Sequence, residues 1–321
     1  MKKLVSYIFP IYNEELNIDR LYEEIDKILK EVEKKYEVEV ICINDGSKDK
    51  SWEKLMDIAN KDYRYKLINF SRNFGHQIAV TAGLDLSKGD AVIIMDADLQ
   101  DPPTVSLELI QKWEEGYDVV FAQRRKRKDT IFKKFTAYAF YRVLDLLADI
   151  KIPKDTGDFR LMDRKVVEAL GKFRERNRFL RGLVAYLGFK QIAVQFDREA
   201  RFAGETGYPL KKMIKFAIDG ITSFSTIPLK LITQFGFFVS VLSFIGIIYT
   251  VGIKIIRPDT TVTGWTFIMV SILFIGGVQM IMMGILGTYI GRIYHEVQNR
   301  PLYLIKDTYS KSTKKESQAI S

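Results

Sequence analysis

Two long stretches without a charged residue constrain this chain more than any other feature of its sequence. The first runs from Leu231 to Ile253 and the second from Thr260 to Gly291, and the second is apolar enough to insert over about 265–289. As a helix the first stretch would span roughly 35 Å, which exceeds the ~30 Å hydrocarbon core of a bilayer. Buried helices of soluble proteins rarely run this long without charge. The sequence therefore predicts a two-helix transmembrane hairpin over 231–291, with spans at about 231–253 and 265–289.

The cations around the hairpin predict its orientation. Only Lys254 and Arg257 lie in the connector, whereas lysines and arginines are numerous on both flanks. The positive-inside bias then places both termini in the cytoplasm, on a multi-pass protein of the plasma (inner) membrane. Residues 209–230 mix apolar side chains with lysines and serines, which predicts amphipathic helices on the membrane surface, with an ordinary docking helix as the alternative. Residues 292–321 are predicted to be a cytoplasmic tail, disordered after Asp307 because serine, lysine and threonine dominate there.

Charge and cysteine content narrow the class of protein further. The 321 residues include 49 lysines and arginines against 40 acidic residues, a formal net charge of +9. Such an excess favours a partner that carries phosphates, which could be nucleic acid, an anionic membrane or a phosphorylated substrate. Cys42 is the only cysteine, so an intrachain disulfide framework is excluded.

Short apolar strands alternate with amphipathic helices in the first half of the chain. Strands are predicted at 4–9, 38–43, 67–70, 91–95 and 119–122, and helices at 14–34, 52–59, 77–86 and 105–115. Asn13 is predicted to cap the first helix. This order predicts an α/β domain over 1–208, built on a parallel sheet with right-handed crossovers. Ligands of such sheets bind beyond the carboxyl ends of the strands.

A pair of carboxylates follows the most hydrophobic strand. Asp96 and Asp98, one residue apart, can grip a single divalent cation together with substrate phosphates. A nucleotide diphosphate leaving group needs such a cation, because negative charge builds on it as the sugar departs. The pair alone occurs by chance in many proteins, but here it joins a buried strand to a helix that begins with prolines. Asp101 is interpreted as a residue of that helix start.

Several motifs, in their order along the chain, resemble those of family 2 glycosyltransferases. The shared motifs are Pro10-Ile11-Tyr12-Asn13-Glu14, Asn44-Asp45-Gly46-Ser47 and Asp96-Ala97-Asp98-Leu99-Gln100. Two others, Ser71–His76 and Thr156–Met162, are similar to those of the branch that makes polyprenyl-phosphate sugars, which includes dolichol-phosphate mannose synthases and bactoprenol glucosyltransferases. The resemblance covers about Leu4 to Leu304. It implies a GT-A fold (a nucleotide-sugar-binding, Rossmann-like domain), an inverting single displacement and a divalent metal, Mg²⁺ or Mn²⁺.

The resemblance also implies roles for residues on the donor side. The nucleotide would be bordered by Pro10, Tyr12, Glu14, Asp45 and Asp96, with Arg201 on a loop that closes over the diphosphate. Asp45 would accept a hydrogen bond from the base, although turn formation alone also explains Asn-Asp-Gly. The metal would be surrounded by Asp96, Asp98 and Gln100. His76 is interpreted as structural or as lying at the substrate edge, since no second ligand is near it in sequence.

The densest run of cations, Gln123 to Lys128, follows a predicted strand end. A solvated face or a membrane-surface contact would explain it, but Arg124 together with Lys133 or Lys134 is predicted to hold the acceptor phosphate. Asp158, in the acceptor-side motif, is predicted to orient a substrate rather than remove a proton. A phosphate monoester is already largely dianionic near neutral pH, with a second pKa of about 6. Asp98 and Asp158 are therefore the predicted catalytic residues.

These features predict the inverting transfer of a sugar to undecaprenyl phosphate, giving a polyprenyl-phosphate sugar for cell-envelope glycosylation. UDP-glucose is the first choice of donor, with UDP-N-acetylglucosamine and GDP-mannose as alternatives. A processive polysaccharide synthase is disfavoured because no tryptophan lies in a Gln-x-x-Arg-Trp signature, and intact motifs argue against an inactive membrane scaffold. The predicted partners are a nucleotide sugar, a polyprenyl phosphate and the membrane, not nucleic acid. A homo-oligomer and a lipid-sugar flippase are left open.

Overall fold

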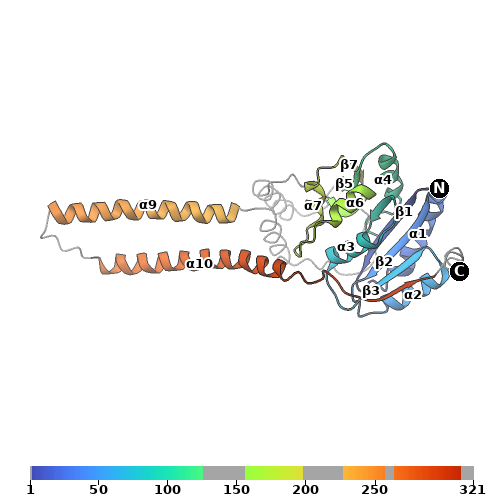
Figure 1. Cartoon of the computed structure of the whole chain (residues 1–321), viewed down its shortest axis with the longest axis horizontal. Helices are drawn as coiled ribbons and strands as arrows, with labels where there is room; N and C mark the ends of the chain where they lie inside the picture. Colours follow the sequence, from blue (N-terminus) through green and yellow to red (C-terminus); the bar gives the residue numbers. More distant parts are fainter. Residues whose placement is uncertain (1, 126–155, 198–226, 257–263, 312–321) are drawn as a thin grey trace. The chain divides into compact units, whose positions relative to one another are not determined.

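The computed structural model describes residues 2–125, 156–197, 227–256 and 264–311. They belong to two compact units (Figure 1). The first unit takes in the described residues up to Asp197 and those from Arg300 onward, and the second contains the described residues from Ile227 to Asn299. Several predictions concern segments outside the described residues. These are the roles of Arg201, Lys133 and Lys134 and the surface helices expected before residue 227.

Among the described residues, the first unit contains one eight-stranded sheet in the order β7-β5-β6-β4-β1-β2-β3-β8. Its strands are β1 Leu4–Ile11, β2 Glu37–Asn44, β3 Tyr65–Phe70, β4 Ala91–Ile94, β5 Val119–Arg124, β6 Thr156–Asp163, β7 Gln191–Phe196 and β8 Ile305–Ser310. Its helices are α1 Ile18–Val32, α2 Ser51–Lys61, α3 His76–Leu86, α4 Val105–Glu114, α6 Arg164–Gly171 and α7 Leu180–Tyr186. The alternation predicted for the first half of the chain is confirmed.

The central strand β1 is buried on both faces because helices cover both sides of the sheet. Alternate residues of β1, among them Tyr7 and Phe9, belong to the core that α1, α2 and α4 complete. Every apolar residue on the predicted face of α1 is buried, and burial of each such side chain contributes about 1.5–3 kcal/mol. On the opposite face, α3 lies so close to β1 that a Cβ at Gly83 would approach Ile8 Cγ2 to 2.4 Å. Glycine at this position therefore lets α3 rest directly on the strand.

The sheet is mixed, so the prediction of a parallel sheet is only partly correct. Strands β3, β2, β1 and β4 run parallel in that order. However, β6 lies between β4 and β5 and is antiparallel to both, and β8 is antiparallel to β3. Periodicity along the chain cannot reveal this, because strand direction depends on connections rather than on local pattern.

Two local predictions are wrong. The first helix starts at Ile18 with Asn17 at its N-cap, and Asn13 does not cap it. Instead Asn13 adopts a positive φ of 55°, and its Oδ1 accepts a hydrogen bond of 2.8 Å from the Lys48 amide. The disorder predicted after Asp307 is also wrong for residues 308–310, which form part of β8. This edge strand is polar and mostly exposed, so it carries no hydrophobic alternation that sequence reasoning could detect.

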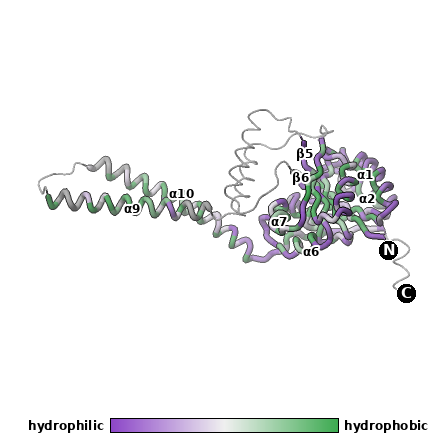
Figure 2. The backbone as a smooth tube through the Cα atoms, turned by 90° about the horizontal axis from the view of Figure 1, so that it is seen from above, coloured by the Kyte–Doolittle hydropathy of each residue, from purple (hydrophilic) through white to green (hydrophobic). Residues whose placement is uncertain are grey.

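The described residues of the second unit form two long helices, α9 Ile227–Ile256 and α10 Trp265–Val297. They cover the two stretches that the sequence predicted as membrane spans, and they lie side by side in Figures 1 and 2. Large apolar residues are exposed on both helices, among them Phe237 and Met280. Much of the tube of both helices is green in Figure 2, the colour of hydrophobic residues. Within the described residues, one helical stretch, Phe274–Val297, is long and apolar enough to cross a membrane, and a shorter apolar stretch, Ile232–Gly246, lies in α9. The two-span transmembrane hairpin therefore stays a prediction.

Candidate active site

The carboxyl ends of three neighbouring parallel strands meet at one edge of the sheet. β1, β2 and β4 end beside one another, with Ile11 opposite Asn44 and Ile8 opposite Ile94. The residues that follow these strands include Tyr12, Asp45 and Asp96. The structure thus brings together the residues predicted for the nucleotide, apart from Arg201, although their contacts with a nucleotide stay predictions.

Reciprocal hydrogen bonds fix the loops after β1 and β2 against each other. The amides of Asn13 and Glu14 donate to the hydroxyls of Ser47 and Ser51, over 3.0 and 2.9 Å. Above these rigid loops the side chain of Tyr12 is 44% exposed, which leaves its ring available to stack on a base.

Asp45 has a role that the sequence did not reveal. Its carboxylate is buried, and its oxygens accept hydrogen bonds from the amides of Phe74 (2.6 Å) and Gly75 (2.9 Å). Burial raises the pKa of Asp45, and the two amide hydrogen bonds oppose that rise. The next residue, Gly46, has φ +66°, and a Cβ there would meet the Arg72 backbone at 2.5 Å. The turn after β2 therefore clamps the segment that leads from β3 into α3.

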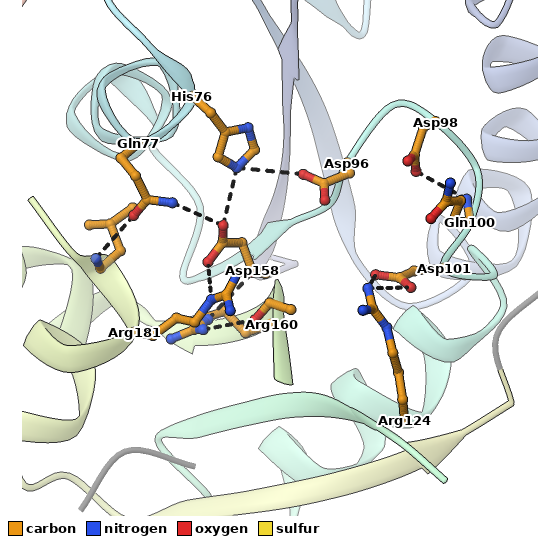
Figure 3. A network of polar contacts seen from close by, with 12 residues as sticks. His76, Gln77, Asp96, Asp98, Gln100, Asp101, Arg124, Asp158, Arg160 and Arg181 are labelled. Atoms are coloured by element: carbon orange, nitrogen blue, oxygen red, sulfur yellow. Dashed lines mark hydrogen bonds and ion pairs between the residues drawn. The ribbon is translucent and has the colours of Figure 1, made fainter. Parts of the chain in front are cut away.

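Asp96 and Asp98 lie in the loop after β4 with the chemistry of a hard-cation site (Figure 3). Asp96 Oδ1 is buried and, within the described residues, has no hydrogen-bond partner. Burial raises the pKa of Asp96 to about 6, which the nearby His76 opposes. Such an orphaned carboxylate oxygen fits Mg²⁺ or Mn²⁺, which prefer oxygen ligands. The described residues hold no group of three or more His, Cys, Asp or Glu side chains that could hold a metal ion. Mg²⁺ is usually bound by one or two carboxylates, with substrate phosphates and water completing its shell.

Gln100, the third predicted metal residue, lies on the same loop. Its side chain is buried, and its backbone amide donates to Asp98 Oδ1 over 3.1 Å. The residue between them, Leu99, adopts a positive φ of 54°, which turns the loop sharply. This bond orients the Asp98 carboxylate, and direct metal ligation by Gln100 stays a prediction.

A polar network around the buried Asp158 is the main feature that sequence reasoning missed. Asp158 lies at the start of β6, where its Oδ2 accepts a hydrogen bond from Gln77 Nε2 (2.9 Å) and lies 3.2 Å from His76 Nε2. Its Oδ1 accepts from Arg181 Nε over 2.9 Å. His76 also lies 3.6 Å from Asp96 Oδ1, so the imidazole links the two carboxylates (Figure 3).

The charges of this network shift the pKa values of its members. Burial alone would raise the pKa of Asp158, but Arg181 and His76 hold it well below its usual range. Burial would lower the pKa of His76, whereas its contacts with Asp158 and Asp96 raise that pKa to about 9. At neutral pH an ionised Asp158 therefore faces an imidazolium and a guanidinium. One sequence signal pointed here, because His76 and Gln77 open a helix directly after the carboxyl end of a strand.

Arg124 is paired with an acid inside the protein, which the sequence also did not reveal. Its Nη2 lies 3.3 Å from Oδ1 of the buried Asp101, and its Nε is buried without a hydrogen-bond partner in the described residues. The interpretation of Asp101 as a helix-start residue is wrong, because α4 begins at Val105 with Thr104 as its N-cap. Gly157, in the same motif as Asp158, lies beside this pair. A Cβ added to Gly157 would be 3.5 Å from Arg124 Nη2. Arg124, which is predicted to bind the acceptor phosphate, thus lies next to the motif Thr156–Met162.

Residues 6–171 match the family model for glycosyl transferase family 2. The chain belongs to that family. It is 49% identical over 311 residues to the uncharacterized glycosyltransferase YkcC of Bacillus subtilis (strain 168), covering 97% of this chain and 95% of the relative. It is 42% identical over 306 residues to the SfII prophage-derived bactoprenol glucosyl transferase of Shigella flexneri, covering 95% and 98% of the two chains. The predicted family and enzyme class are confirmed.

The chain also aligns in part with solved structures. S. aureus TarS residues 1–349, in complex with UDP-GlcNAc, aligns with a TM-score of 0.48 at 18% identity, covering 70% of this chain and 66% of that one. The match to family 2, together with the helix-covered mixed sheet, gives the chain a GT-A-like α/β domain, as the resemblance implied.

Proposed function

We propose that this glycosyltransferase moves a sugar from a nucleotide diphosphate to the phosphate of a polyprenyl lipid. The observation that carries the proposal is the arrangement of two carboxylates around the His76 imidazole. Asp96 Oδ1, 3.6 Å from His76 Nε2, has no hydrogen-bond partner in the described residues, whereas the Asp158 carboxylate, 3.2 Å from the same nitrogen, is neutralised by its partners. The Asp96 side of His76 is proposed to bind a cation together with the diphosphate. The Asp158 side already holds the Arg181 guanidinium. The 42% identity to a bactoprenol glucosyl transferase over nearly the full chain supports a lipid phosphate as acceptor.

The donor side is proposed to hold the nucleotide between the loops after β1 and β2. Tyr12 offers its exposed ring to the base, with Pro10, Glu14 and Asp45 beside it, and Arg201 is proposed to close over the diphosphate. Asp96, Asp98 and Gln100 would hold Mg²⁺ or Mn²⁺. The metal would neutralise charge on the departing diphosphate. The hydrogen bond from the Gln100 amide restrains the Asp98 carboxylate, which supports this proposed role.

The acceptor side is proposed to align a phosphate that needs little activation. Its second pKa is about 6, so the attacking oxygen is already ionised at neutral pH. Asp158 is a poor base, because both of its oxygens accept hydrogen bonds and its pKa is held well below the usual range. Its proposed task is to fix His76 and Arg181 beside the reacting phosphate. Arg124, with Lys133 and Lys134, is proposed to bind the acceptor phosphate, which attacks the anomeric carbon with inversion.

Membrane attachment is proposed to follow the sequence prediction. The catalytic domain (1–208), surface helices (209–230), hairpin (231–291) and tail (292–321) would place both termini in the cytoplasm, at the plasma membrane. The stretch Phe274–Val297 supports one span of that hairpin. Single cysteines at Thr261 and Lys314 should label from opposite sides of sealed vesicles, and labelling of both from one side would refute the hairpin.

The test of function is turnover by the purified full chain in neutral detergent. It would be assayed with undecaprenyl phosphate and separately with UDP-glucose, UDP-N-acetylglucosamine and GDP-mannose. The expected product is one sugar on the lipid phosphate, with inverted anomeric configuration and glucose as the preferred sugar. A polymeric product would favour a processive synthase, and absence of turnover with every donor and Mg²⁺ or Mn²⁺ would favour an inactive scaffold.

A further inference from the structure

The residues after α10 fold back onto the segment that leads into the active site. We define the C-terminal strap as Arg300–Ser310, which includes β8, the red strand beside β3 in Figure 1. The Leu304 carbonyl accepts a hydrogen bond of 3.0 Å from the Ser71 amide, where β3 ends. The ring of Tyr303 stacks on that of Phe70, with centroids 5.3 Å apart and planes at 16°. The strap therefore fixes the start of the connection from β3 to α3.

Contacts continue from the strap to the Asp158 network. Phe70 meets Phe74 edge to face at 5.5 Å, and the amides of Phe74 and Gly75 donate to Asp45. His76 and Gln77 follow directly and hold Asp158. We call Phe70–Gln77 the active-site segment. It is braced by Asp45 on one side and by the strap on the other.

The strap also holds the far end of α3. The Tyr303 hydroxyl donates to Asp85 Oδ2 over 3.0 Å, in the last turn of the helix. Arg174 Nη1 pairs with the same oxygen at 2.7 Å, and Arg176 donates to the Arg300 carbonyl. Tyr303 thus contacts Phe70 through its ring and Asp85, near the end of α3, through its hydroxyl.

We infer that Tyr303 is a positioning residue for the transfer reaction, and that the strap sets where α3 presents His76 and Gln77 to Asp158. Displacements of about 1 Å in positioning groups can cost about a hundredfold in rate, so looseness here would reach the chemistry. Only Gln298 and Asn299 separate the strap from α10, whose candidate span ends at Val297. The membrane helix is therefore tied through the strap to the active-site segment. The inference relies on the proposed role of the Asp158 network.

The test compares two tyrosines of the same strap in the full chain. Tyr303→Ala removes the ring contact with Phe70, whereas Tyr309→Ala is the matched control, since the Tyr309 hydroxyl donates to Asn60 at the other end of the strap. Hydrogen exchange would be measured for the Ser71, Phe74 and Gly75 amides without substrate. Tyr303→Ala should speed their exchange at least about tenfold and lower kcat about tenfold. Tyr303→Phe keeps the ring and should recover most of kcat.

Three results would overturn the inference. One is unchanged exchange at these amides in Tyr303→Ala, and another is an equal effect of Tyr309→Ala, which would mean general loosening of β8. The third is faster exchange with unchanged kcat, which would limit the strap to supporting the fold. Exchange in β1 and β2 shows whether each variant is folded. Because exchange needs no substrate, a wild-type chain without turnover would count against the proposed function, and the exchange data would still decide whether the strap positions the segment.

Discussion

Two loops of the same site place chemically identical groups in opposite surroundings. In the loop after β4, Asp96 Oδ1 is buried without a hydrogen-bond partner among the described residues. At the start of β6, both oxygens of Asp158 accept hydrogen bonds or face a cation. The pKa of Asp96 is raised to about 6 and that of Asp158 is lowered well below its usual range. One carboxylate therefore keeps a buried oxygen without a hydrogen bond, although His76 lies 3.6 Å away, whereas both oxygens of the other accept hydrogen bonds.

The comparison teaches that the type of a residue does not assign its role here. Both aspartates appeared in the sequence as catalytic or metal candidates, and only their partners distinguish them. His76 lies between them and contacts both, so a change on one side is felt on the other.

The largest effect on activity is expected at Asp98, in the proposed metal site. Asp98→Ala should lower kcat/KM by at least about a thousandfold, about 4 kcal/mol, because the cation that neutralises the diphosphate would lose a ligand. The folded and membrane-inserted state should persist, and Mn²⁺ binding followed by electron paramagnetic resonance should weaken. Glu108→Gln, which changes an exposed carboxylate on α4, is the control. Full activity of the wild type in excess chelator would contradict the metal proposal.

A second expectation contrasts stability at the two aspartates in metal-free protein. Asp158→Asn should destabilise at pH 7 by about 3 kcal/mol, since it removes one partner of a buried ion pair. Asp96→Asn should leave Tm unchanged or slightly higher, because burial of Oδ1 already disfavours the ionised form of this partly exposed carboxylate. The pH dependence has opposite signs. The stability contributed by Asp158 is complete above its unfolded pKa of ~3.9 and disappears as pH falls toward its lowered folded pKa. The ionised form of Asp96, by contrast, lowers the stability of the folded state as pH rises from ~3.9 through about 6.

The same variant reports on base catalysis. Asp158→Asn should reduce turnover, yet its remaining activity should follow the ionisation of the lipid phosphate, with an acidic limb near pH 6 as in the wild type. Arg181→Lys should retain more activity than Arg181→Ala, because a lysine can still pair with the carboxylate. Loss of the acidic limb in Asp158→Asn would instead identify Asp158 as the titrating base.

The smallest effect is expected beside the network, at Arg124. Arg124→Ala should raise the KM for the lipid and lower kcat/KM by roughly ten- to a hundredfold, since a charge-assisted hydrogen bond contributes about 1.5–3 kcal/mol. Nucleotide-sugar affinity should change little. The matched control is Arg125→Ala, because Arg125 is more exposed and pairs at 3.9 Å with Asp197. An equal defect in both variants that disappears in neutral detergent would show a contact with lipid head groups instead.

Much of the fold and part of the site could be predicted from sequence because the signals are local. Buried strands such as Ala91–Ile94 are continuous apolar runs, and the face of α1 repeats at helical spacing. Residues that follow parallel strands of one sheet, such as Asp45 after β2 and Asp96 after β4 on either side of β1, lie at the same edge of that sheet. The contacts that were missed all join distant parts of the chain. Asp158 and Arg181 come from separate elements, Asp101 reaches Arg124, and β8 pairs with β3 through backbone groups that any sequence offers.

The position of β8 in the chain has a consequence for biosynthesis. Asn69 on β3 bonds to Asp307, 238 residues later, and both long helices are synthesised between them. Until β8 leaves the ribosome, the edge of β3 lacks this neighbour, and pairing at such sequence separation is slow. The active-site segment would therefore be completed only after the apolar helices have been made. A nascent chain shorter than 300 residues would carry every catalytic motif and still lack the strap that positions them.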